Sequence, residues 1–159
     1  MITVSIELPP SSNHRLLPIK GRQIKAPAYR NWLDRAACSI AAQLPRDHAP
    51  LKGALFSLVG VIFPDKRKRD IDNILKPVND ALVKGGAIHD DSLLTWQAVC
   101  KLGISKQAAK VEIIILTEQD QGAGAIKALM SALNERMHGG DLVDWSSNSK
   151  KQFDKCRSY

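Results

Sequence analysis

The sequence predicts a single α+β domain, a mixed β-sheet with packed helices, followed by a C-terminal helical extension. Segments with strand-like and helix-like apolar spacing follow one another in the order β-α-β-α-β-β-α. The 159 residues, 44% of them hydrophobic and 25% charged, suffice for one core and lie far from a disordered composition. We place the domain at residues 1–118 and the extension at 119–159.

The N-terminal half contains two strands and one helix. Residues 2–8 alternate as a strand does, and Pro9-Pro10 end them. The stretch 11–22 is polar and predicts a long loop. Apolar residues at i, i+3, i+4 and i+7 spacing predict an amphipathic helix over 28–44. The apolar run 54–63 is rich in β-formers, which indicates a buried strand.

A second helix follows the buried strand. Its apolar stripe continues to Gly85-Gly86, which stop it. Pro77 is tolerated only in the first turn of a helix, because proline lacks the N–H that later turns need. We therefore expect the helix to begin within 73–76, with 70–72 as the turn that leads into it.

The C-terminal half continues with strands. Runs of β-forming residues at 93–102 and 110–117, separated by a short polar segment, predict a hairpin. Helical spacing returns at about 123–138, and the tail after it is polar.

The net charge of +7 favours a polyanionic partner such as nucleic acid, although simple solubility is the plain alternative. No apolar run approaches the ~18 residues of a membrane span, and the first residues lack the pattern of a secretory signal. The three cysteines are widely spaced, which argues against a disulfide framework and a cysteine zinc site. We therefore expect a cytoplasmic protein without a membrane partner.

Carboxylates gather around the second helix in the sequence. Asp70 and Asp72 follow the buried strand, and Asp91, preceded by Asp90, follows the helix. If the helix packs on the sheet, the two turns can converge. Three carboxylates brought together repel one another and need a cation, and an all-oxygen set favours Mg²⁺ or Mn²⁺. Such a site could activate water for phosphodiester hydrolysis.

Basic residues adjoin these acids. Lys76 follows Asp72 at i+4 and could stabilise the charge that develops on a phosphate. The run KRKR at 66–69 could attract a polyanion. Each feature also has an ordinary structural explanation. The first acids could cap the helix, Asp72 and Lys76 could form a surface ion pair, and the basic run could be a solvated loop.

The segment RDIDNILKPVNDALVKGGAIHDDSL, residues 69–93, resembles the RusA family of Holliday-junction resolvases. The family pattern R-D-x-D-N-x-x-K-x-x-x-D-A-L, with D-D after a short gap, is present here, and PPSSNHR at 9–15 is similar to the family's early segment. The family's aromatic residues after the asparagine are replaced by Leu16 and Leu17.

The resemblance implies a Mg²⁺-dependent homodimer, encoded by a bacterium or prophage, that cuts four-way DNA junctions by paired symmetric incisions. It implies Asp70, Asp72 and Asp91 as metal-binding catalytic acids, with Lys76 as a catalytic cation. The residues implied in DNA binding are Asn13, Arg15, Lys66, Arg67, Lys68, Arg69 and Asn73.

Three other functions remain open at this point. The chain could be a nuclease for other branched DNA, a basic DNA-binding module without catalysis, or an unrelated scaffold. Dependence of cleavage on Mg²⁺ and on Asp72 separates the first from the second, and salt-dependent DNA affinity separates both from the third.

Overall fold

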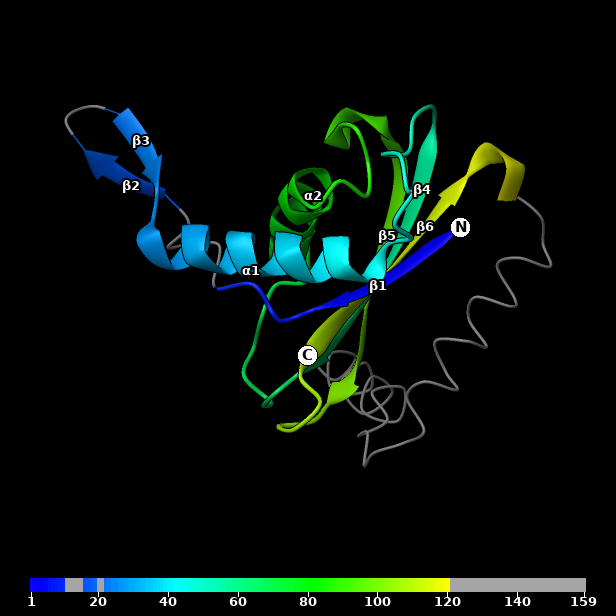
Figure 1. The fold of residues 1–159 in the computed structure, drawn as a ribbon. Helices are drawn as coiled ribbons and strands as arrows, with labels where there is room; N and C mark the ends of the chain where they lie inside the picture. Colours follow the sequence, from blue (N-terminus) through cyan, green and yellow to red (C-terminus); the bar gives the residue numbers. More distant parts are fainter. Residues whose placement is uncertain (11–15, 20–21, 121–159) are drawn as a thin grey trace, which may run out of the picture.

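The computed structural model describes residues 1–10, 16–19 and 22–120. A four-stranded sheet is covered on one face by two helices, α1 and α2, and a small two-stranded hairpin lies at the far end of α1 (Figure 1). The predicted α+β class with a mixed sheet is confirmed. The predicted helix at 123–138 lies outside the described residues, and the boundary after residue 118 stays a prediction. No helix among the described residues has the length and apolar character needed to cross a membrane.

The main sheet has the strand order β1-β6-β4-β5. Its strands are β1 (Ile2–Ile6), β4 (Leu55–Phe63), β5 (Leu94–Ile104) and β6 (Lys110–Thr117). β6 pairs antiparallel with both β1 and β4, whereas β4 and β5 are parallel. The apolar run predicted as a buried strand is β4, which lies inside the sheet.

The predicted hairpin between the last two strands is wrong, because β4 lies between β5 and β6. α2 connects β4 to β5, and a helical crossover makes neighbouring strands parallel. β6 then crosses to the other side of β4. Burial explains this choice: β6 is buried along most of its length, whereas β5 is only partly covered and suits an edge.

A hairpin takes up part of the stretch 11–22, for which the polar sequence predicted a long loop. β2 (Leu16–Ile19) pairs antiparallel with β3 (Arg22–Lys25) in a separate two-stranded sheet. All four residues of β3 are exposed. A strand with no buried face lacks the alternating pattern on which strand prediction depends, so β3 could not be predicted from apolar spacing.

The two helices follow the sequence closely. α1 spans Pro27–Gln43 and α2 spans Leu75–Lys84, with Pro77 as the third residue of α2. A short 3₁₀ turn, η2 (Asp72–Ile74), leads into α2 as expected. The apolar faces of both helices and of the sheet form one core, whose fully buried members include Tyr29, Ile40, Leu55, Leu82, Ile113 and Ile115.

α1 and α2 approach closely where α2 ends. A Cβ atom built on Gly85 would lie 2.8 Å from Cβ of Ile40, 2.9 Å from its Cγ2 and 3.0 Å from the carbonyl oxygen of Ala37. All three atoms belong to the packed face of α1. Glycine at this position therefore sets the spacing between the two helices.

We expect Gly85→Ala to lower the free energy of unfolding by about 1–3 kcal/mol, because the added methyl must push two packed helices apart. Urea denaturation followed by tryptophan fluorescence measures the change, since Trp32 of α1 is 2% exposed and reports on this core. An unchanged denaturation midpoint would contradict the tight helix contact.

The outer edge of β1 is covered by a side chain of α1. The Gln43 amide donates to the carbonyl oxygen of Ser5 at 2.8 Å, and its own oxygen accepts from the Ser5 N–H at 2.9 Å. Both backbone groups of Ser5 are therefore bonded at the edge of the sheet, beyond which the described residues form no further strand.

Candidate active site

The turn before α2 does not use its polar side chains as helix caps. The residues at the N-cap positions of η2 and α2 are Ile71 and Ile74, and neither helix has a side-chain capping hydrogen bond. Asp70, Asp72 and Asn73 are exposed. The capping explanation for these acids is therefore not supported.

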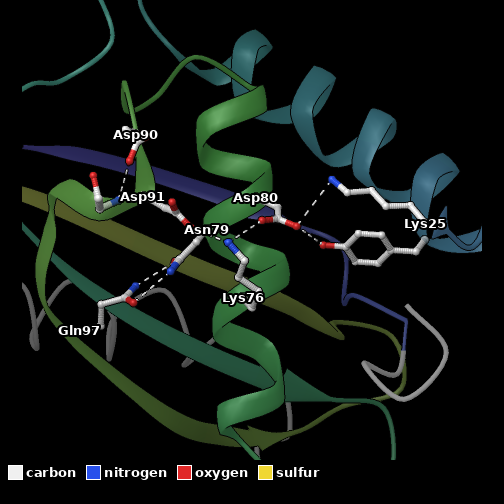
Figure 2. Close-up of polar contacts among 9 residues, drawn as sticks. Lys25, Lys76, Asn79, Asp80, Asp90, Asp91 and Gln97 are labelled. Atoms are coloured by element: carbon white, nitrogen blue, oxygen red, sulfur yellow. Dashed lines mark hydrogen bonds and ion pairs between the residues drawn. The ribbon is translucent and has the colours of Figure 1, made fainter. Parts of the chain in front are cut away.

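Lys76 lies between two carboxylates (Figure 2). Its ammonium donates to Oδ2 of Asp91 at 2.6 Å and lies 3.1 Å from Oδ1 of Asp80. The predicted alternative, a surface pair of Lys76 with Asp72, is not among the ion pairs of the described residues. Asp91, and to a lesser degree Asp80, raises the pKa of Lys76. The ammonium is therefore held in its charged form.

Asp80 was not assigned a role from the sequence, although it belongs to the family pattern. Its Oδ2 accepts a hydrogen bond from the Tyr29 hydroxyl at 2.7 Å and lies 3.8 Å from the ammonium of Lys25. Burial would raise the pKa of Asp80, but the bonds from Tyr29 and Lys76 outweigh it and lower the pKa. The i+4 spacing of Asp80 from Lys76 is the sequence feature from which their pairing could have been predicted.

The two acids after α2 have different roles. Asp90 is the N-cap of the 3₁₀ turn η3 (Asp91–Leu93), and its side chain accepts from the Ser92 N–H at 2.9 Å. This bond lowers the pKa of Asp90. Asp90 therefore stabilises this turn. Asp91 points instead to Lys76 in the first turn of α2.

The three acids implied as metal ligands are not gathered in this structure. Their carboxylate oxygens are donors that a hard divalent ion accepts. Within the described part of the chain, however, no group of three or more His, Cys, Asp or Glu side chains is placed to hold a metal ion. Asp91 contacts Lys76, whereas Asp70 lines a pocket on the side of residues 66–69, which we call the basic loop. The donor types fit a metal ion and their present arrangement does not.

In the basic loop, one cation is held by hydrogen bonds and the others are exposed to solvent. Arg69 makes two hydrogen bonds to the carboxylate of Asp65, at 2.7 and 3.0 Å, and its guanidinium lies 5.1 Å from the centre of the Phe63 ring. The bond from Arg69 lowers the pKa of Asp65 to about 2. Lys66 and Lys68 are exposed and take part in no ion pair of the described residues. The charge open to a polyanion lies mainly on these lysines and on the exposed Arg67.

A pocket of about 530 Å³ joins the basic loop to the N-terminal segment. Its lining combines apolar and cationic side chains with one acid and one amide: Leu8, Pro9, Pro10, Phe63, Pro64, Arg67, Lys68, Arg69, Asp70, Asn73 and Ile74. The structure thus brings the prolines after β1 beside the loop after β4. Asn13 and Arg15, predicted to bind DNA, lie outside the described residues.

The comparisons with known proteins agree with the resemblance seen in residues 69–93. The family model of the endodeoxyribonuclease RusA matches residues 7–115. A crossover junction endodeoxyribonuclease RusA of Aquifex aeolicus is 35% identical over 85 residues, which cover 54% of this chain and 66% of that protein. The protein of the same name from Escherichia coli O139:H28 is 31% identical over 133 residues, which cover 76% of this chain and 100% of that protein.

The match runs from just after β1 into β6, and it includes the basic loop, α2 and the turn of Asp91. The residues gathered around Lys76 therefore lie within the part of the chain that the family model matches. This chain belongs to the RusA family of endodeoxyribonucleases.

Proposed function

We propose that this chain hydrolyses phosphodiester bonds at four-way DNA junctions, in the bacterial cytoplasm and as a homodimer. The observation that carries the proposal is the Asp80–Lys76–Asp91 cluster on a helix that follows an exposed basic loop in the sequence, within a chain whose relatives are named crossover junction endodeoxyribonucleases. Two symmetric incisions require two equivalent sites, which a two-fold dimer supplies.

The cluster suits a phosphate that gains charge. Lys76 has three N–H donors, of which two are directed at Asp80 and Asp91. The third can donate to a phosphate oxygen, and the half-exposed ammonium is accessible to DNA. Hydrolysis adds water across a P–O bond, so negative charge builds on the phosphate oxygens before the leaving oxygen takes up a proton. A fixed cation lowers the energy of that state.

The exposed lysines of the basic loop would draw the DNA backbone to this side of the molecule. Their contacts would be with phosphates, which position DNA and carry no sequence information. Asn73 and the pocket after β1 extend the same surface toward Leu8, Pro9 and Pro10. Recognition of a junction would then depend mainly on its shape.

We extend the proposal to Mg²⁺ as cofactor, with Asp70, Asp72 and Asp91 as its ligands. Its support is the chemistry of three carboxylates, together with a nuclease family in which a divalent ion is the usual partner. Mn²⁺ has the same oxygen preference and would substitute for it.

The test is incubation of the full chain with a labelled immobile four-way junction, in Mg²⁺ and in EDTA. We expect paired nicks at symmetric positions with Mg²⁺ and none with EDTA. Duplex, flap and three-way DNA of the same length serve as controls. Equal cutting of all branched substrates would indicate a broader nuclease. Binding of the junction without any product, in Mg²⁺ and Mn²⁺ alike, would leave only a DNA-binding module.

A further inference from the structure

The ion pair of Lys76 with Asp91 is too exposed to hold the ammonium in place by itself. The side chain of Lys76 is 54% exposed and carries the ammonium on a flexible four-carbon stem. The side chain of Asp91 is itself 35% exposed. An exposed ion pair between two such groups is weak and easily exchanged for water. A second, better fixed carboxylate on the other side of the ammonium would keep it in place.

Asp80 has the properties that this task requires. Its side chain is only 16% exposed, and its two oxygens face different partners. Oδ2 accepts the hydroxyl of Tyr29 at 2.7 Å, and Oδ1 faces the ammonium of Lys76 at 3.1 Å. Since Asp80 and Lys76 are four residues apart on α2, the helix itself sets their spacing.

Tyr29 fixes Asp80 from the protein core. The residue is 1% exposed and packs with its ring centre 5.7 Å from that of Trp32 on α1. A ring held in this way cannot swing, so its hydroxyl is a stable donor for Asp80. Lys25, at the end of β3, lies 3.8 Å from the same carboxylate oxygen and 5.8 Å from the centre of the Tyr29 ring.

We propose that Asp80 is a positioning residue that fixes the ammonium of Lys76 beside Asp91, and that Tyr29 of α1 anchors Asp80 for this purpose. The proposal rests on the proposed function only in taking Lys76 as the cation that meets the phosphate. In this proposal, α1 and the hydrophobic core support the active site without contacting DNA themselves.

The kinetic test compares Asp80→Asn and Tyr29→Phe with the wild-type chain on a four-way junction. We expect kcat to fall about tenfold for Asp80→Asn and about threefold for Tyr29→Phe, with KM unchanged, because small misplacement of a catalytic group slows chemistry without weakening binding. Asp80→Glu, which keeps the charge, should recover part of the loss. The matched control is Asp34→Asn, which removes the ion pair of Asp34 on α1 with Lys84 on α2.

A purely structural role would give a different pattern. Asp80→Asn and Asp34→Asn would then lower the melting temperature alike and leave kcat unchanged well below it. That result, or a kcat loss shared equally by Asp34→Asn, would overturn the proposal.

A measurement without catalysis separates this inference from the proposed function. In ¹H–¹⁵N NMR, ammonium protons held by carboxylates exchange slowly with water and give a visible signal. We expect the Lys76 signal to be lost in Asp80→Asn and weakened in Tyr29→Phe, while the Lys84 signal stays. An unchanged Lys76 signal in Asp80→Asn would refute the positioning role even if junctions are cut. A wild-type chain that cuts no junction, with the Lys76 signal lost as expected, would refute the function and leave the positioning intact.

Discussion

Asp72→Asn is expected to reduce junction cleavage by a factor on the order of 10²–10³ while the fold and the DNA affinity remain. Asp72 is exposed and caps neither η2 nor α2, so its carboxylate has no evident structural duty. The substitution removes a charge beside the basic loop, and binding of DNA should tighten slightly. Single-turnover cleavage in Mg²⁺, together with a gel-shift titration in Ca²⁺, measures the two effects.

Asp47→Asn is the matched control for this change. Asp47 is an exposed acid between α1 and β4, at the end of β4 opposite to the basic loop. Both variants lose one negative charge, so any purely electrostatic gain in binding can be compared. Cleavage by Asp72→Asn at the wild-type rate would remove Asp72 from the predicted ligand set.

Replacing both Lys66 and Lys68 by Ala is expected to weaken junction binding about tenfold at moderate salt. It should also lower the slope of log affinity against log salt by about 2, since each lost phosphate contact removes ~0.9. Both lysines are exposed and free of ion pairs among the described residues. Fluorescence anisotropy at several salt concentrations gives both values.

The control for this pair is Arg46→Ala with Lys52→Ala, which removes two exposed cations before β4. It changes the net charge by the same amount at the opposite end of that strand. Equal losses of affinity and slope in the two double variants would mean that the chain binds DNA through its overall charge, without a defined basic surface.

The elements that the sequence predicted well are those with a strong apolar pattern. β4 and β6 are buried along most of their length, and both helices bury one clear stripe, so their residues had to be apolar at fixed spacings. Strand partners were not predictable in this way. Whether β5 pairs with β4 or β6 depends on which strand can be left at the edge, and local spacing carries no such information.

The site shows the same division. The residues of one turn or one helix could be grouped from spacing alone, but Lys76 has Asp72 four residues before it and Asp80 four residues after it. The sequence favoured the first and the structure pairs the second. Tyr29 reaches Asp80 from 51 residues away, through the packing of α1 against α2. No periodicity links two such positions, so this contact could be found only in the folded chain.

The amide of Gln43 has a consequence for solubility. An unpaired strand edge is a template on which another molecule can add a strand, and such growth leads to aggregation. By bonding both backbone groups of Ser5, Gln43 blocks this addition near the C-terminal end of β1 without using a charge or a proline. If the end of α1 detached from β1, the backbone groups of Ser5 would therefore become available to a strand of another molecule.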